Sequence, residues 1–135
     1  MFTLTLVTPE KKLISATEIE EAFVPAARGE LNILPGHAPL MTTLETGDLR
    51  YRLKGESKLH HVAISWGYCQ VNPEGVNVLA ETAERPDEID VARADQAMKS
   101  AEMKITTDAS PEEIEKYSRK ISRATVRKEV GGLPH

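Results

Sequence analysis

The sequence predicts a β plus α chain, with an N-terminal antiparallel β-sandwich followed by a C-terminal antiparallel two-helix hairpin. Three observations predict it. Apolar and polar residues alternate in short runs over residues 1–84. Glycine and proline turns separate those runs. After Arg85-Pro86 the apolar spacing changes to three and four residues, which is typical of a packed helix. We therefore assign residues 1–84 to a β-sandwich domain and residues 85–135 to a helical hairpin domain.

The strands of the first domain are indicated by side chains that alternate between an apolar and a polar face. Leu49, Tyr51 and Leu53 alternate with charged residues, so one face of this strand is apolar and the other is solvated. The same alternation recurs at Phe2, Leu4 and Leu6, at Val62, Ile64 and Trp66, and at Val76, Val78 and Ala80. Turns are expected at Pro35-Gly36, Gly55-Glu56-Ser57 and Asn72-Pro73-Glu74-Gly75.

The second domain is predicted to contain helices over residues 87–105 and 111–129. Acidic residues at 87, 88 and 90 suit the first turn of the first helix, where the helix dipole favours negative charge. Ser110, Pro111 and Glu113 supply a cap, an N-terminal proline and a capping box for the second. The expected apolar seam comprises Val91, Ala94, Met98, Ala101 and Ile105 of the first helix and Ile114, Tyr117, Ile121 and Ala124 of the second. Because alanines bury little area, we expect this hairpin to be only marginally stable.

The composition argues against a disulfide-linked protein, a Cys-based zinc protein and a membrane-spanning protein. The 135 residues carry a net charge of −4 and contain one cysteine, Cys69, which excludes an internal disulfide and a Cys-based zinc cluster. No run approaches the roughly 20 apolar residues of a membrane helix, and the N-terminus lacks a signal-peptide pattern, so we expect membrane association only through partners.

Six basic residues between 116 and 128 follow one another without an intervening acid. A solvated helix face, a surface that docks on an acidic partner and, more weakly, a nucleic-acid surface all remain open readings of this block. Because the net charge of the whole chain is negative and Tyr117 is the only aromatic residue in the block, we expect no nucleic acid partner.

Three segments carry a resemblance to a known family. Residues 29–40, Gly-Glu-Leu-Asn-Ile-Leu-Pro-Gly-His-Ala-Pro-Leu, closely resemble the G-x-L-G-I-L-P-G-H-A-P-L run of the ATP synthase epsilon family. Residues 65–71 are similar to its S-G-G-F-x-E-V strand. Residues 78–85 and 89–94 resemble its domain junction and first helix. These runs follow the family's order along the whole chain.

The resemblance implies a non-catalytic rotor subunit in the central stalk of an F-type ATP synthase. Its expected partners are the gamma subunit, the c-ring and, when the hairpin is extended, the catalytic beta and alpha subunits. The sandwich would couple proton-driven rotation of the c-ring to ATP synthesis, and the hairpin would regulate or inhibit ATP hydrolysis. The lack of a transit peptide favours a bacterial source, which implies a peripheral position on the cytoplasmic face of the inner (plasma) membrane.

A proline- and glycine-shaped loop is the first candidate site. It comprises Leu34, Pro35, Gly36, His37, Ala38 and Pro39. An ordinary tight turn explains its composition. The resemblance implies instead a contact with the c-ring and gamma, with His37 as a contact or orienting residue. The pair His60-His61 is not expected to bind one metal, because adjacent strand residues point to opposite faces.

The second candidate site is on the hairpin, where residues 89–94 match the I-D-x-x-R-A motif with which some family members bind ATP. The resemblance implies a regulatory ATP site made of Glu84, Ile89, Asp90, Arg93, Ala94, Arg123 and Arg127. A local ion pair between Asp90 and Arg93 is the simpler reading. Where the ATP-binding members carry a further arginine, this chain has Ser100.

The basic stripe of Lys116, Lys120, Arg123 and Arg127 has a competing use as an inhibitory face. We expect no catalytic residues, no metal and no required cofactor, and the chain has no G-x-x-x-x-G-K-[ST] phosphate loop. The alternative function is a free-standing ATP-sensing module that uses the hairpin. A stand-alone hydrolase is poorly supported, because no catalytic dyad or triad can be assembled from the spacing.

Overall fold

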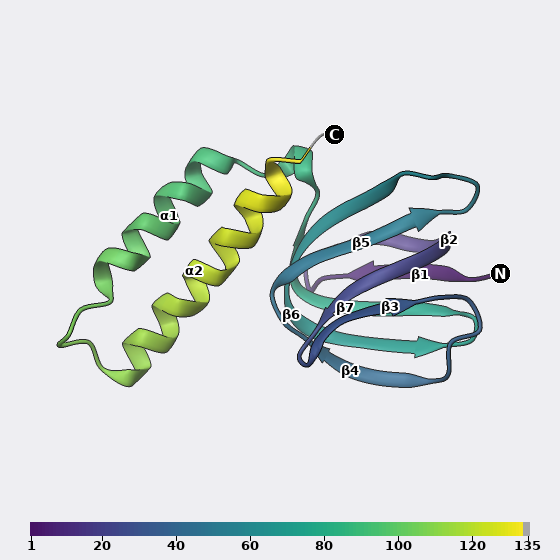
Figure 1. Cartoon of the computed structure of the whole chain (residues 1–135), viewed down its shortest axis with the longest axis horizontal. Coiled ribbons are helices and arrows are strands. Elements are labelled where there is room, and N and C mark those ends of the chain that lie inside the picture. The colour runs from purple at the N-terminus through teal and green to yellow at the C-terminus, as the bar shows by residue number, and fades with distance from the viewer. Residues whose placement is uncertain (134–135) are drawn as a thin grey trace. The chain divides into compact units, whose positions relative to one another are not determined.

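The computed structural model describes residues 1–133, which form seven strands, one short 3-10 turn and two helices (Figure 1). The strands are β1 (Thr3–Val7), β2 (Lys12–Ala26), β3 (Gly29–Ile33), β4 (Leu40–Leu44), β5 (Gly47–Leu53), β6 (Leu59–Asn72) and β7 (Gly75–Glu84). The 3-10 turn is η1 (Pro86–Glu88), and the helices are α1 (Val91–Lys104) and α2 (Pro111–Gly131). The chain divides into two compact units, Met1–Glu84 and Arg85–His135.

The strand unit is held together by a closed circuit of backbone pairing. Strand β1 pairs with β7, β7 with β6, β6 with β5, β5 with β2, and β2 with β1. Strands β3 and β4 extend the arrangement by pairing with β2 and β6, respectively. The two long strands, β2 and β6, therefore take part in both layers of the sandwich, and closing the circuit leaves few free strand edges.

One pairing differs from the antiparallel arrangement that the sequence predicts. Strands β1 and β7 run parallel, with Thr3 opposite Gly75 and Val7 opposite Leu79, whereas the other strand pairs are antiparallel. Gly75 permits this pairing to begin, because a Cβ atom there would lie 2.5 Å from the Thr3 carbonyl oxygen. Alternation of side chains does not reveal the relative direction of two distant strands, so the sequence could not have indicated it.

The core confirms the predicted alternation. Leu4, Leu6, Leu49, Val76 and Val78 are each no more than 2% exposed. Full burial of a side chain of this kind contributes about 1.5–3 kcal/mol, so a cluster of this size dominates the stability of the unit. The cluster also includes Ile14, Ile19, Val24, Ile33, Leu44, Tyr51, Val62, Ile64, Cys69 and Val71.

Strand β6 bends where it changes partner. It pairs with β5 up to Ile64 and with β4 from Gly67 onward. Between them, Trp66 adopts a φ of +26° and is only half-buried, whereas Ile64 and Ser65 are both buried, so the predicted alternation of Val62, Ile64 and Trp66 is broken at Trp66. A Cβ at Gly67 would lie 1.8 Å from the Leu79 carbonyl oxygen, so only glycine fits against β7 here. The buried hydroxyl of Ser65 is satisfied by Thr82 Oγ1.

The first helix begins later than the predicted residue 87. Residues 86–88 form η1 instead, and Ile89 is extended (φ −91°, ψ 124°), which separates the turn from the helix. Asp90 is the cap of α1, where its carboxylate oxygen accepts a hydrogen bond from the Arg93 amide at 3.0 Å. The predicted start of α2 is confirmed, because Ser110 and Glu113 form a capping box and Pro111 is its first residue.

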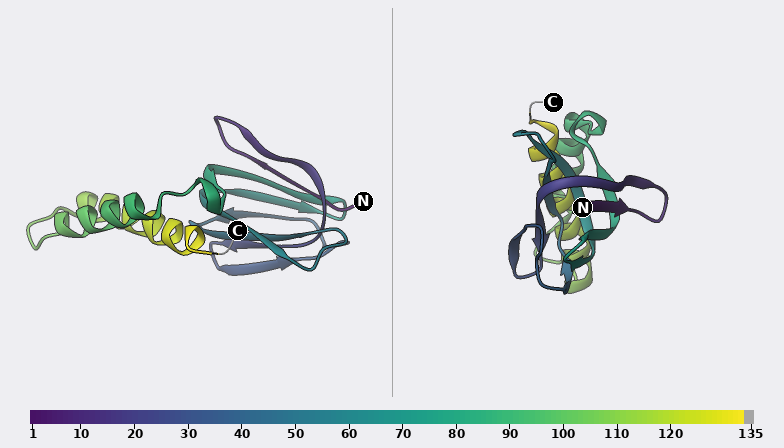
Figure 2. Two further views of the ribbon diagram at one scale, coloured as in Figure 1. Left: turned by 90° about the horizontal axis from the view of Figure 1, so that it is seen from above. Right: turned by 90° about the vertical axis from the view of Figure 1, so that its right-hand side faces the viewer.

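The two helices run side by side in Figures 1 and 2 and pack through small residues. Ala94, Ala101 and Ala124 are buried between them, whereas Val91 and Ile114 of the expected seam are 36% and 40% exposed. An ion pair also joins the helices, because Lys128 Nζ of α2 lies 2.7 Å from Asp95 Oδ1 of α1. Within α1, Lys99 Nζ lies 3.0 Å from Asp95 Oδ2. The hydrogen bond from Lys128, aided by Lys99, lowers the pKa of the Asp95 carboxyl.

The buried thiol gives a test of the strand unit. Burial raises the pKa of Cys69 to about 11, and the side chain is 0% exposed. At pH 8 only on the order of a thousandth of such a thiol is thiolate, which is the reactive form. We expect iodoacetamide to alkylate the native chain at least on the order of a hundredfold more slowly than the chain in denaturant, where the pKa is about 8.5. Equal rates, measured by mass spectrometry, would contradict the packing around β6.

Candidate functional site

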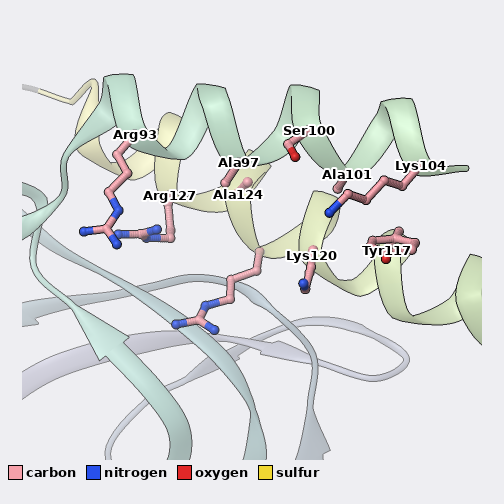
Figure 3. A pocket seen from close by; sticks show the side chains of 10 residues that line it. Arg93, Ala97, Ser100, Ala101, Lys104, Tyr117, Lys120, Ala124 and Arg127 are labelled. Atoms are coloured by element: carbon pink, nitrogen blue, oxygen red, sulfur yellow. The ribbon is translucent and has the colours of Figure 1, made fainter.

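A basic groove runs along the hairpin between α1 and α2 (Figure 3). Its volume is about 370 Å³. Side chains from α1 form one wall: Arg93, Ala97, Ser100, Ala101 and Lys104. Side chains from α2 form the other: Tyr117, Lys120, Arg123, Ala124 and Arg127. The alanines and Ser100 are small enough to leave the groove open, while the long cationic side chains surround it.

The lining of the groove is strongly cationic. It holds five basic side chains and no carboxylate. Within residues 1–133, neither Arg93 nor Arg123 forms an ion pair with an acid, and the same holds for Lys120. By contrast, Lys99 and Lys128, which lie outside the groove, both contact Asp95. Arg93, Lys120 and Arg123 thus lie along one groove with no ion pair to an acid among residues 1–133, which raises the local positive potential, so the groove favours an anion.

The structure brings together part of the predicted ATP site. Arg93, Arg123 and Arg127 line the groove, and the first and last project into the same end of it in Figure 3. Guanidinium groups in this arrangement suit the oxygens of a phosphate. The spacing of Arg123 and Arg127, four residues apart on one helix, is what places them on a shared face.

The remaining predicted ATP residues do not line the groove. Ala94 and Ile89 are buried. Asp90 caps α1 through the backbone amide of Arg93, and no ion pair joins these two side chains in the part of the chain that the structure describes. Glu84 is the last residue of β7 and belongs to the strand unit.

The sequence interpretation missed the end of the groove near the turn between the helices. Lys104 and Lys120 extend the lining there, and their Nζ atoms each lie 5.5 Å from the centre of the Tyr117 ring. The Nζ of Lys116, a member of the predicted inhibitory face, lies at the same distance. The available signal was the spacing of Arg93, Ala97, Ser100 and Lys104, which at intervals of 4, 3 and 4 places Lys104 on the same face as Arg93.

The loop predicted to contact partners joins β3 to β4. Pro35 and Gly36 occupy its turn, Gly36 has a φ of +81°, and the His37 amide donates to the Leu34 carbonyl at 3.1 Å. This is the pattern of a type II turn. The Nδ1 of His37 lies 2.7 Å from the Ala38 carbonyl oxygen, which can only accept, so Nδ1 is the donor and Nε2 is the acceptor in the neutral ring. Leu34 is 50% exposed at the tip.

An apolar patch covers the outer face of four adjacent strands, and the sequence interpretation did not anticipate it. Met41 on β4, Tyr68 on β6 and Leu79 on β7 are 69%, 58% and 45% exposed. Tyr68 lies opposite Leu79, which lies opposite Val7 of β1, so the patch is continuous across the sheet. Its hollow of about 450 Å³ is lined by Thr5, Val7, Met41, Tyr68, Gln70, Asn77, Val78 and Leu79. Large apolar side chains that lie exposed together on the outer face of a sheet are candidates for a docking surface.

The histidine pair makes two separate contacts. His60 Nε2 lies 3.0 Å from Glu56 and its ring stacks on Tyr51, while His61 Nδ1 lies 2.7 Å from Asp48. Within the described residues, no group of three or more potential ligands could hold a metal ion.

Neither helix of this part of the chain combines the length and the apolar character needed to cross a bilayer.

Comparison with known proteins identifies the family. The profile described as "ATP synthase, Delta/Epsilon chain, beta-sandwich domain" matches residues 1–86. A protein of Bdellovibrio bacteriovorus named ATP synthase epsilon chain is 53% identical over 110 residues, covering 82% of this chain and 79% of the relative. The protein of the same name from Geobacter sp. strain M21 is 44% identical over 129 residues, covering 94% and 91%.

Solved structures share the fold. A chain of the Euglena gracilis mitochondrial ATP synthase, solved as OSCP/F1/c-ring, matches with a TM-score of 0.80 at 22% identity and covers 92% of this chain and 78% of that one. A chain of the central stalk/c-ring structure of the Tetrahymena thermophila enzyme matches with a TM-score of 0.69 at 18% identity and covers 96% of both. On the sequence matches above, the chain belongs to the ATP synthase epsilon chain family, whose members are non-catalytic subunits of the ATP synthase.

Proposed function

We propose that this chain is a rotor subunit of the central stalk, which couples proton-driven rotation of the c-ring to ATP synthesis in the catalytic subunits. The observation that carries the proposal is the apolar patch of β1, β4, β6 and β7 on a member of this family. A rotor subunit must bind its neighbours firmly and must not deform under torque. The closed circuit of strand pairing would make the strand unit rigid, and the apolar patch would provide the binding surface.

The gamma subunit is the partner that we assign to the apolar patch. Tyr68 and Leu79 would be buried at the centre of this interface and would anchor it, because aromatic and large apolar side chains contribute most of the binding energy of protein interfaces. The surrounding Thr5, Gln70 and Asn77 would form its polar rim.

The c-ring is assigned to the loop of residues 34–39. The type II turn fixes the backbone of this loop and presents Leu34 to its surroundings. A preformed loop loses little conformational entropy on binding, which favours a lasting contact. With these two partners, the chain would be a peripheral component on the cytoplasmic face of a bacterial inner membrane.

The hairpin is assigned a regulatory role in ATP hydrolysis. Three of the four buried residues of its helices are alanines, the fourth being Val130, so separating the two helices exposes less apolar area than an interface of large side chains would. An element held this weakly can adopt a second arrangement. When extended, the face of Lys116, Lys120, Arg123 and Arg127 would meet acidic surface of the alpha and beta subunits and slow hydrolysis.

Regulatory binding of ATP to the hairpin is a second candidate function, favoured by the arginines that line the groove. A ligand at ten times its dissociation constant stabilises the bound form by about 1.4 kcal/mol, which is roughly a tenfold shift in population. For a marginally packed hairpin, such a shift would hold the two helices together. A free-standing ATP-sensing module would use the same residues without the rotor partners.

The assignment of gamma is tested by placing a charge in the apolar patch. We expect Leu79→Asp to weaken binding to the gamma subunit by on the order of tenfold or more, because the carboxylate would have to be desolvated in an apolar interface. Asn32→Asp, at an exposed position of β3 outside the patch, is the matched control and should bind as the unaltered chain does. Co-purification and titration measure both, and equal binding by the two variants would reject the patch as the interface.

The regulatory role is tested in the assembled ATP synthase by removing residues 86–135. We expect faster ATP hydrolysis without the hairpin, because its inhibitory position would be vacant. Hydrolysis by the complete and truncated assemblies is compared at equal enzyme concentration. An unchanged rate would remove the regulatory proposal and leave the coupling proposal standing.

The ATP site is tested by calorimetric titration of the full chain with ATP. The double variant Arg123→Ala with Arg127→Ala should lose at least tenfold in affinity, since each arginine supplies charged donors to phosphate oxygens. Arg119→Ala, on the same helix but outside the groove lining, serves as the control. No heat from the unaltered chain at millimolar ATP would refute this site.

A further inference from the structure

Met98 is the large apolar side chain at the centre of the α1 face that packs on α2. Its neighbours along this face, four residues before it and three after it, are Ala94 and Ala101, which are 0% and 3% exposed. Ala124 of α2 is also buried, at 3%. The distance between packed helices depends on the side chains at the contact, so alanines let α1 and α2 approach closely. The half-buried side chain of Met98 therefore lies in a narrow space between the two helices.

The sulfur of Met98 contacts the opposite helix. The Thr125 hydroxyl oxygen lies 3.5 Å from Met98 Sδ and 2.8 Å from the Ile121 carbonyl oxygen. A hydroxyl has one hydrogen to donate, and a carbonyl is a stronger acceptor than a thioether, so the hydroxyl donates mainly to Ile121. The sulfur therefore contributes to this interface by packing, as a soft and polarisable group that fills the space between the helices.

The four methionines of the chain differ in their access to solvent. Met1, Met41 and Met103 are 87%, 69% and 80% exposed, whereas Met98 is half-buried. An oxidant converts methionine to the sulfoxide only where it reaches the sulfur. We therefore expect Met98 to react slowly while the hairpin is closed and quickly when α1 and α2 separate. Met103 lies five residues farther along the same helix and supplies an exposed reference for that rate.

Oxidation changes Met98 from an apolar side chain into a polar and larger one. Hydrogen peroxide transfers one oxygen atom to the thioether: the peroxide O–O bond breaks, an S–O bond forms on the oxidised sulfur, and the peroxide is reduced to water. The new oxygen is an acceptor that is costly to bury without a hydrogen bond, and the added atom overfills a close-packed contact. Turning the Thr125 hydroxyl towards this oxygen would supply one hydrogen bond, but it would not widen the space between the helices.

We propose that Met98 is an oxidation site through which peroxide loosens the helical hairpin. The oxidant reaches the sulfur when α1 and α2 separate, and the resulting sulfoxide prevents the two helices from packing together again. Methionine sulfoxide is returned to methionine by sulfoxide reductases, so the change is reversible. An effect on ATP hydrolysis rests on the regulatory role of the hairpin proposed above, whereas the oxidation and its effect on the helices do not.

Amide hydrogen exchange of the full chain, measured before and after treatment with hydrogen peroxide, tests the proposal. Peptide mass spectrometry follows the sulfoxide at each methionine and the exchange of each element. The control is Met98→Leu, a substitution that nearly conserves volume and removes the thioether. After oxidation this variant still carries sulfoxides at the other methionines, so it isolates the contribution of Met98. Amides of the strand unit show in every sample whether that unit remains folded.

We expect Met103 to be oxidised severalfold faster than Met98, because its sulfur is exposed without any opening of the hairpin. Once Met98 is oxidised, the amides of α1 and α2 should exchange faster by on the order of tenfold or more, since the helices separate more often. The oxidised Met98→Leu chain should exchange like its untreated form, and a sulfoxide reductase should restore slow exchange in the unaltered chain. Met98→Gln, which carries a polar side-chain oxygen without peroxide, should also exchange faster, whereas Met103→Gln should not.

Unchanged exchange of α1 and α2 after complete oxidation of Met98 would overturn the proposal. A Met98 that stays reduced after treatment far longer than Met103 needs would overturn it as well, as would equal exchange in Met98→Gln and Met103→Gln. Hydrolysis by the assembled ATP synthase carrying the oxidised chain is a separate measurement. Faster exchange of the helices with unchanged hydrolysis would support the oxidation site and count against the regulatory role instead.

Discussion

The bend in β6 is the constraint on which the strand unit depends. At residues 65–67 the strand leaves β5 and takes up β4, so one continuous strand serves two layers. The change of partner requires β6 to pass so close to β7 that Gly67 has no room for a side chain, and it places Trp66 at a positive φ. The Ser65–Thr82 contact holds β6 to β7 directly beside this point. Without the bend the circuit of pairing could not close, and the apolar patch, which spans β4, β6, β7 and β1, would not be continuous.

Much of the fold could be predicted from the residues, because alternation and helical spacing are local signals. Leu49, Tyr51, Val76 and Val78 reveal their buried face by their neighbours, and Ser110 with Glu113 reveals a helix start. The features that could not be predicted are non-local. The parallel pairing of β1 with β7 joins residues more than seventy positions apart, and the late start of α1 follows from a 3-10 turn that competes with the helix for the same acidic residues. Trp66 departs from the predicted alternation because such a pattern assumes a regular strand backbone, whereas the family pattern that residues 65–71 resemble has glycine at this position.

The candidate site divides in the same way. Arg123 and Arg127 could be paired by their spacing on one helix, and Arg93 by its motif. The contribution of Lys104 depends on which residues of α2 face it, which only the packing of the two helices decides. Ala101 and Ala124 are buried, so the helices approach closely and bring Lys104 to Tyr117. The apolar patch was missed for a different reason: Met41, Tyr68 and Leu79 belong to separate strands, and each alone is an ordinary exposed residue.

The parallel pairing of β1 with β7 also sets the order in which a growing polypeptide can fold. Strand β1 emerges first from the ribosome, but its partner residues 75–79 follow only after nearly the whole strand unit has been translated. At about 5–20 residues per second, this leaves β1 waiting several seconds with one edge unpaired, next to β2. Closure of the sandwich is therefore a late, single event in biosynthesis. The hairpin, whose contacts are close together in the sequence, can form afterwards without disturbing it.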